Sequence, residues 1–156
     1  MRLYFYNESY KNIIENYELT EDQLRFTKHP KECLELAKED SDRYSILAME
    51  DDTIVNFFVL HENEGVKPYS TNRNSILLRA FSTDNRHQGQ GYAKKVLNLL
   101  PEFVEEHFSE KDEIVLAVNI QNKVAQRLYE KCGFVDEGVR TMGPKGELII
   151  MSYYLS

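Results

Sequence analysis

Two hydrophobic periods alternate along the chain, and together they predict both strands and helices. Short runs rich in branched and aromatic residues are typical of strands, whereas apolar residues three and four apart are typical of helices. The strand-like segments are residues 2–6, 43–50, 53–62, 75–82 and 113–118. The helical segments are residues 8–16, 30–40, 89–107 and 122–131, with Pro101 expected to kink or restart the third of them.

Turn residues fix where these segments end. Asp51 and Asp52 separate two strand-like runs and predict a hairpin, while residues 63–74 read as a loop. Asn122 is a natural helix N-cap, and Gly133 is a natural stop after the same helix. Residues 134–154 predict a closing hairpin around Gly143-Pro144-Lys145-Gly146.

The order of the elements predicts an α+β fold with a mixed sheet, in one domain that spans residues 1–156. Hydrophobic residues make up 42% of the chain and charged residues 29%, which is enough apolar material for a packed core. No apolar stretch approaches the about 18 residues that a membrane span needs, so we expect no membrane association and a cytoplasmic protein. Cys33 and Cys132 have no metal-like spacing, and we expect two ordinary thiols and no metal site.

Charge is distributed unevenly along the chain. Residues 1–64 hold 7 Lys and Arg against 15 Asp and Glu, whereas residues 65–156 hold 12 against 11. This balance argues against nucleic acid as a partner, because nucleic acid requires a basic face. It permits an anionic ligand on the second half and a cationic one on the first, although acidic residues also simply keep a small protein soluble.

Gly89 and Gly91 lie where a helix should begin, directly after a strand and a turn. The first N–H groups of a helix have no internal partner and carry the positive end of its dipole. Glycine costs about 1 kcal/mol inside a helix, but it leaves these N–H groups open to close approach. A phosphate or pyrophosphate is the natural ligand for such a place, and a plain glycine-rich turn with exposed cations is the alternative.

Two familiar phosphate motifs do not fit this segment. No Gly-Lys-Ser/Thr follows the glycines, so the segment is not a Walker loop. The dinucleotide fingerprint needs a third glycine and an early strand–helix–strand unit, and both are missing.

The segment RHQGQG after a strand, followed later by LAVNIQN and AQRLYEKCGF, resembles the GNAT family, the Gcn5-related N-acetyltransferases. The matching residues are Arg86, Gly89 and Gly91, then Asn122, then Leu128, Tyr129, Gly133 and Phe134. The resemblance covers about residues 75–135 strongly. It implies a splayed mixed sheet of about seven strands flanked by helices, and acetyl-CoA as the acetyl donor.

The resemblance also implies how the cofactor is held. The pyrophosphate would lie on the glycine loop, and the pantetheine arm would pair with the end of the strand before it. His87 stands where the family often has a second glycine, but its backbone N–H remains. The implied cofactor-binding residues are Arg79, Ala80, Phe81, Arg86, His87, Gln88, Gly89, Gln90, Gly91, Tyr92, Asn122 and Tyr129.

Tyr129 matches the usual general acid of the family. A primary amine attacks the thioester, an oxyanion forms, and CoA leaves as a thiolate that needs a proton. A phenol with a pKa near 10 can donate that proton, and the resemblance places the oxyanion at a backbone N–H, that of Phe81. The alternative is a tyrosine that serves only the core.

The amine must also lose a proton, which costs about 4 kcal/mol at pH 7 for an ammonium of pKa about 10. Some family members carry a glutamate for this purpose, and the matching place here is Ala117. Glu62, Glu64, Asp84 and His61 are the unplaced candidates for a base.

The family's first helices line the acceptor side, and here they belong to the acidic half. We therefore expect a small cationic amine, and residues 19–40 loosely resemble the bacterial spermine/spermidine acetyltransferase branch. A protein N-terminus, a lysine and an aminoglycoside are the other acceptors, and a CoA sensor without catalysis and a dinucleotide binder are the other classes of function. Members of the family are often dimers, so residues 147–155 could pair across a homodimer interface or close the chain's own sheet.

Overall fold

A seven-stranded mixed sheet, in the order β1-β2-β3-β4-β5-β7-β6, organises the computed structural model, which describes residues 1–155. Neighbouring strands are antiparallel except β4 and β5, which are parallel. The α+β class with about seven strands is thereby confirmed, and Ser156 of the predicted domain lies outside the described residues. The strands are β1 (Arg2–Phe5), β2 (Arg43–Glu50), β3 (Thr53–His61), β4 (Ser75–Thr83), β5 (Glu113–Asn119), β6 (Val135–Gly143) and β7 (Gly146–Tyr154).

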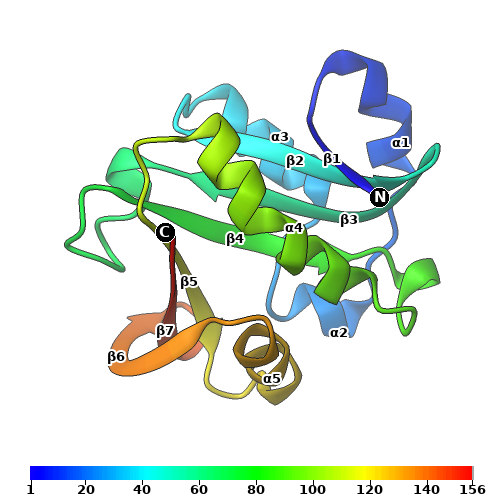
Figure 1. Ribbon diagram of the computed structural model, residues 1–156. Coiled ribbons are helices and arrows are strands. Elements are labelled where there is room, and N and C mark those ends of the chain that lie inside the picture. The colour runs from blue at the N-terminus through cyan, green and yellow to red at the C-terminus, as the bar shows by residue number, and fades with distance from the viewer. Residues whose placement is uncertain (156) are drawn as a thin grey trace.

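Helices cover both faces of the sheet. In Figure 1, α4 crosses one face, while α1 and α3 lie behind the other. The helices are α1 (Lys11–Glu15), α2 (Glu21–Leu24), α3 (Pro30–Lys38), α4 (Tyr92–His107) and α5 (Lys123–Lys131), and 3-10 turns lie at Glu8–Tyr10, Asn63–Gly65 and Asn85–His87. No helix of the described chain is long and apolar enough to span a membrane.

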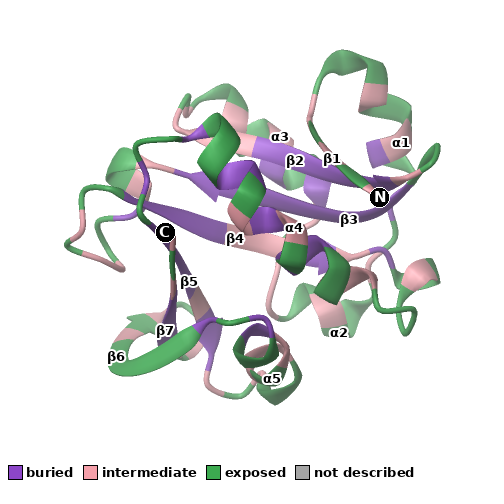
Figure 2. Cartoon of the chain, viewed as in Figure 1, coloured by how far each residue is buried: buried purple, intermediate pink, exposed green. Residues whose placement is uncertain are grey.

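The core lies on both faces of the sheet because each strand buries alternate side chains on opposite faces. Phe58 and Leu78 pack with Leu97 of α4 and Tyr129 of α5 on one face. The other face packs its apolar side chains against α1 and α3 (Leu47, Phe57, Ile14 and Cys33 among them). Figure 2 shows that β2, β3 and β4 are the buried centre of the sheet, whereas β6 is an exposed edge.

Local sequence determines several helix ends as predicted. The Asn122 side chain accepts a hydrogen bond from Ala125 N and caps α5, and Gly133 follows that helix with a φ of +97°. Pro30 occupies the first position of α3, where a missing N–H costs nothing. Helix α4 runs from Tyr92 to His107 as one element through Pro101, so the expected restart does not occur.

The N-terminal helical prediction needs correction in two places. Residues 8–16 do not form one helix, because the Asn7 side chain binds Ser9 N and closes a 3-10 turn before α1 begins at Lys11. The sequence analysis also missed α2. Thr20 and Gln23 form a capping box there, and this pattern was readable in the sequence as a helix start.

Two further predictions concern the C-terminal strand and the cysteines. Strand β7 lies between β5 and β6, so both of its edges are used within the chain's own sheet. Cys33 and Cys132 are both buried free thiols.

Candidate active site

The sheet splits between β4 and β5. The parallel ladder joins Ser75 to Glu113 and ends at Leu78 and Leu116. Beyond that point β5 stays paired with β7 as far as Asn119, while β4 follows β3. The β4 edge that faces β5 is therefore open from Arg79 onward, and main-chain groups there are available to an extended ligand.

A bulge in β4 lies at the split. Val59 of β3 faces Arg79 and Phe57 faces Ser82, so β4 has an additional residue between these two pairs. Ala80 has a φ of +55°, a left-handed conformation that is strained for a residue with a Cβ. The bulge bends β4 away from β5 and puts Ala80 and Phe81 at the opening.

The glycine loop follows β4 directly. Gly89 and Gly91 have φ values of +78° and +79°, and α4 begins at Tyr92. A Cβ placed on either glycine would meet no atom within 4 Å, so both positions face open space. No side chain caps the first turn of α4, which leaves its N–H groups for a ligand.

The cavity that joins these features has a volume of about 510 Å³ and passes along the split. On one side it is lined by the glycine loop and by α4 and α5, and on the other by the α2 segment. It includes ten of the twelve predicted cofactor-binding residues, namely Arg79, Ala80, Phe81, His87, Gln88, Gly89, Gly91, Tyr92, Asn122 and Tyr129. Arg86 and Gln90 are not among the lining residues.

Tyr129 of α5 lines the cavity. Its ring lies edge-on to Phe81 at 6.1 Å and to Phe134 at 5.9 Å. Its side chain makes no hydrogen bond within the described chain, so the hydroxyl has no internal partner to give up before it meets a substrate. Burial raises the pKa of Tyr129 above its usual value, which keeps the phenol protonated at neutral pH.

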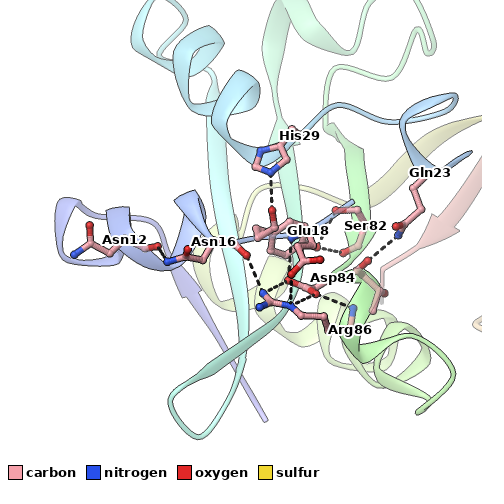
Figure 3. A network of polar contacts seen from close by, with 10 residues as sticks. Asn12, Asn16, Glu18, Gln23, His29, Ser82, Asp84 and Arg86 are labelled. Carbon is pink, nitrogen blue, oxygen red and sulfur yellow. Dashed lines mark hydrogen bonds and ion pairs between the residues drawn. The ribbon is translucent and has the colours of Figure 1, made fainter. Parts of the chain in front are cut away.

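Asp84 and Arg86 form an ion pair, here called the latch, directly before the glycine loop in the chain, and Figure 3 shows its contacts. The Arg86 guanidinium donates to both carboxylate oxygens of Asp84, at 3.0 and 2.8 Å, and to Asn16 O at 2.8 Å. Asp84 is fully buried and also accepts from Glu18 N at 3.1 Å and Arg86 N at 2.9 Å. The latch ties the glycine loop to the segment before α2, and it occupies both the main-chain N–H and the side chain of Arg86.

Further hydrogen bonds hold the same segment to the end of β4. Tyr17 Oη donates to Ser82 O at 2.8 Å, and Gln23 Nε2 donates to Thr83 O at 2.8 Å. The His29 ring nitrogen lies 2.8 Å from Tyr17 O. The two walls of the cavity are thus joined at one end by a buried polar network.

Replacing Asp84 with asparagine is expected to lower the free energy of unfolding by about 2 kcal/mol or more. The reason is that the NH₂ group of asparagine would face the N–H donors of Arg86, which then lose an acceptor. Asp136→Asn is the matched control. It also breaks a carboxylate–arginine pair, with Arg140 at 2.8 Å, but that pair lies on the exposed strand β6. We expect the control to cost less than about 1 kcal/mol in urea unfolding, and equal effects would contradict a latch.

The stability of the fold at acidic pH should also depend on the Asp84 carboxylate. Burial acts to raise the pKa of Asp84, but the hydrogen bonds from Arg86 and Glu18 outweigh it and hold that pKa below the usual range. A lowered folded-state pKa stabilises above the unfolded value of about 3.9, and this contribution is lost as the pH falls through the folded value. Stability should therefore fall less steeply below about pH 4 in Asp84→Asn than in the wild type.

None of the four predicted base candidates lines the cavity. Glu62 lies 3.7 Å from Lys111, and Glu64 pairs with Lys67 on the surface. Asp84 is part of the latch. His61 Nε2 lies 2.9 Å from Asp40, and its Nδ1 lies 3.2 Å from Arg79 Nη1.

A larger cavity, of about 670 Å³, lies between α1, α3, β1 and β2. It includes none of the predicted cofactor-binding residues, and its charged lining mixes both signs, with Glu8, Glu15 and Glu35 beside lysines and Arg43. The glycine loop, the open β4 edge and Tyr129 all line the smaller cavity, which is therefore the candidate active site. Within residues 1–155, no His, Cys, Asp and Glu side chains are grouped to hold a metal ion.

Solved structures with a similar fold include acetyltransferases. The chain is similar to the aminoglycoside acetyltransferase AAC(6')-Ib in complex with coenzyme A and kanamycin, with a TM-score of 0.79 and 18% identity over 97% of this chain and 93% of that chain. It is also similar to the spermidine N-acetyltransferase from Vibrio cholerae in complex with CoA and spermine, with a TM-score of 0.67 and 19% identity over 98% and 94%. At these identities, the likeness shows a shared fold.

Sequence comparison gives the family. Residues 10–134 match the model of the acetyltransferase (GNAT) family. A curated relative, the uncharacterized N-acetyltransferase YbbJ of Bacillus subtilis (strain 168), is 44% identical over 154 residues, which cover 98% of this chain and 96% of that protein. The chain belongs to the acetyltransferase (GNAT) family and is by that membership an acyltransferase, as the resemblance predicted.

The α2 wall of the cavity contains four residues that the sequence motifs did not single out. Asp22, Gln23, Phe26 and Thr27 line it, and they come from α2 and the segment that follows. The capping box at Thr20 could have located the helix, but no sequence pattern predicts that this helix folds over the split. The latch was likewise not predictable, because Asn16 and Glu18 are far from Asp84 and Arg86 in the chain.

Proposed function

We propose that the protein transfers an acetyl group from acetyl-CoA to a primary amine by direct attack inside the split-sheet cavity. The observation that carries this proposal is the continuity of the cavity, which joins the glycine loop, the open β4 edge and Tyr129 to the α2 wall. A cofactor that enters from the glycine loop would bring its thioester to the bulge. The amine would then approach from the α2 side.

The proposed cofactor-binding groups belong to the glycine loop, the open β4 edge and the start of α5. The main-chain N–H groups of residues 88–92 in the glycine loop receive the pyrophosphate, with Lys94 at the cavity wall as a counter-charge. The N–H of His87 is not among them, because it already donates to Asp84 O at 2.8 Å. The open edge at Arg79, Ala80 and Phe81 pairs with the amides of the pantetheine arm. Asn122 keeps its side-chain NH₂ free to donate while its oxygen caps α5. Arg86 shapes the loop through the latch and makes no direct contact with the cofactor.

Chemistry follows from these positions. The amine nitrogen attacks the thioester carbon, and the oxyanion that forms is stabilised by the main-chain N–H of Phe81. The carbon–sulfur bond then breaks, and the thiolate takes the proton of the Tyr129 phenol, which solvent later restores. A tyrosine with a raised pKa is protonated at the start of every cycle, as a general acid must be.

The amine proton is proposed to leave through water. Asp22 and His87 are the lining residues, besides the tyrosines and cations, that can accept a proton. Asp22 is exposed and lies 3.5 Å from Arg25, whereas His87 belongs to the glycine loop. Neither is placed at the bulge, so we assign the role of base to neither.

A small molecule with a primary amine is the proposed acceptor. A polyamine is a candidate because the chain is acidic overall, with a net charge of −7, and because solved neighbours of the same fold are spermidine and aminoglycoside acetyltransferases. The charge argument is weaker than the sequence suggested, since Asp22 is the one carboxylate among the lining residues. Protein N-termini and lysine side chains are the alternative acceptors.

CoA release in the presence of acetyl-CoA and a panel of amines tests the function. We expect turnover with at least one small amine and none without an amine. Tight CoA binding with no turnover on any amine would favour a CoA sensor instead. Protection from heat by NAD, and none by CoA, would favour a dinucleotide binder.

A further inference from the structure

Arg79 is a cation without a counter-ion at the point where the sheet splits. It lines the cavity and is partly buried, and no carboxylate of the described chain lies within ion-pairing distance of it. The only hydrogen bond of its side chain within residues 1–155 runs from Nη1 to His61 Nδ1, at 3.2 Å. Its Nε and Nη2 thus keep their donors for a ligand.

A buried chain of hydrogen bonds fixes the direction of this guanidinium. Because Arg79 Nη1 donates, His61 Nδ1 accepts, and the proton of the ring lies on Nε2, which donates to Asp40 at 2.9 Å. His61 is only 5% exposed, and a Cβ on Gly65 would collide with its ring, so the imidazole has no other place. The guanidinium is therefore held in advance of binding.

Charge in this cluster is unbalanced. Asp40 supplies one negative charge and lies 3.6 Å from Arg43, while Arg79 adds a second positive charge. Burial lowers the pKa of His61, and Arg43 and Arg79 lower it further, which keeps the imidazole neutral. Burial also lowers the pKa of Arg79, with Arg43 as the next cause, as expected for a cation that lacks an anionic partner.

Arg79 projects to the side of the sheet opposite α4 and α5. Leu78 packs on the α4 face, so its neighbour Arg79 faces the other side, where His61 and α3 lie. The α2 wall is on this side too, and there the buried Thr27 hydroxyl has no hydrogen-bond partner in the described chain. Two polar groups at the acceptor end of the cavity are thus left for a substrate.

We propose that Arg79 binds a carboxylate of the acceptor, so that the preferred substrate is a small primary amine that also carries a carboxylate. Arginine matches a carboxylate with two parallel hydrogen bonds, and a positive charge in the lining of the cavity disfavours a purely cationic amine. This inference rests on the proposed acetyl transfer and selects among its acceptors. Among the proposed acceptors, it expects amino acids to be better substrates than polyamines.

Matched pairs of amines that differ by one carboxylate test the inference. Lysine and cadaverine form one pair, ornithine and putrescine a second, and arginine and agmatine a third. For each pair, the ratio of kcat/KM for the carboxylated member to that for its partner is measured in the wild type and in Arg79→Gln. Comparing the two ratios cancels the intrinsic reactivity of the amines.

We expect the ratio to fall at least about tenfold in Arg79→Gln, in keeping with the loss of a charge-assisted hydrogen bond, and to recover in part in Arg79→Lys. Arg73→Gln removes an exposed arginine from the loop before β4 and should leave the ratio unchanged. An unchanged ratio in Arg79→Gln would overturn the proposal. So would a loss of acetyl-CoA affinity equal to the loss in acceptor kcat/KM, because Arg79 would then serve the cofactor.

A binding measurement separates this inference from the proposed function. Calorimetry on CoA-saturated protein compares the N-acetylated products of each pair and needs no turnover. A preference for the carboxylated product that Arg79→Gln removes supports the subsite even if no amine in the panel is acetylated. If only the amines that lack a carboxylate are acetylated, and calorimetry shows no preference between the products, the acetyl transfer stands and the subsite is refuted.

Discussion

Phenylalanine in place of Tyr129 is expected to lower kcat at least tenfold, with only a modest change in affinity for acetyl-CoA. General acids typically contribute about 10²- to 10⁴-fold, and the hydroxyl removed here has no internal partner whose loss could perturb the fold. The ring would keep its edge-on contacts with Phe81 and Phe134. Steady-state rates of CoA release at saturating acetyl-CoA measure the effect.

Tyr153→Phe is the matched control for this substitution. Tyr153 packs against Phe134 at 5.6 Å and does not line the cavity. Loss of its hydroxyl should leave kcat within about twofold, as expected for a residue outside the site. An unchanged kcat in Tyr129→Phe would remove Tyr129 from the role of general acid.

The pH dependence of the wild type should agree with that role. Burial raises the pKa of Tyr129 above its ordinary value of about 10, so the phenol stays protonated throughout the neutral range. Deprotonation of Tyr129 should therefore cause no loss of kcat below about pH 10.

Glutamate in place of Gly89 is expected to weaken acetyl-CoA binding by about a hundredfold or more. The position faces open space in the cavity, so the new side chain would lie where the pyrophosphate is proposed to bind. It would also place a carboxylate against a diphosphate at the N-terminus of α4. Direct titration with acetyl-CoA measures the change.

The strain of the substitution itself needs a control, because Gly89 has a φ of +78°. Gly138→Glu provides one. Gly138 has a φ of +90° and equally open surroundings, but it lies in the bulge of the exposed strand β6, outside the cavity. Both variants should lose about 1–2 kcal/mol of stability from the left-handed backbone, and only Gly89→Glu should lose cofactor affinity. Normal binding in Gly89→Glu would refute the pyrophosphate assignment.

Periodicity and short motifs were sufficient to predict the strands and the helices α3, α4 and α5. Branched runs such as EIVLAV predicted β5, and Asn122 and Gly133 marked the ends of α5 because caps and left-handed stops depend on a few adjacent residues. The glycine loop was likewise local. These features require no knowledge of what packs against them.

The remaining features depend on contacts between distant parts of the chain. Ala80 has a left-handed backbone although it is neither glycine nor asparagine, the residues that usually signal this conformation in a sequence. The split of the sheet imposes it. Arg86 fitted a cofactor motif, yet its side chain bonds to Asp84, the N-cap of the same 3-10 turn, and to Asn16, which is distant in the chain. His61 was a candidate base, and its place between Asp40 and Arg79 became apparent only with the register of β3 and β4.

A crystal structure with bound acetyl-CoA tests the central claim most directly, because that claim places the thioester at the split between the glycine loop and Tyr129. We predict the pyrophosphate on the main-chain N–H groups of residues 88–92 and the pantetheine arm along the β4 edge. The thioester sulfur should lie within hydrogen-bonding distance of the Tyr129 hydroxyl. A cofactor bound in the cavity between α1 and α3, or a sulfur out of reach of Tyr129, would contradict the account.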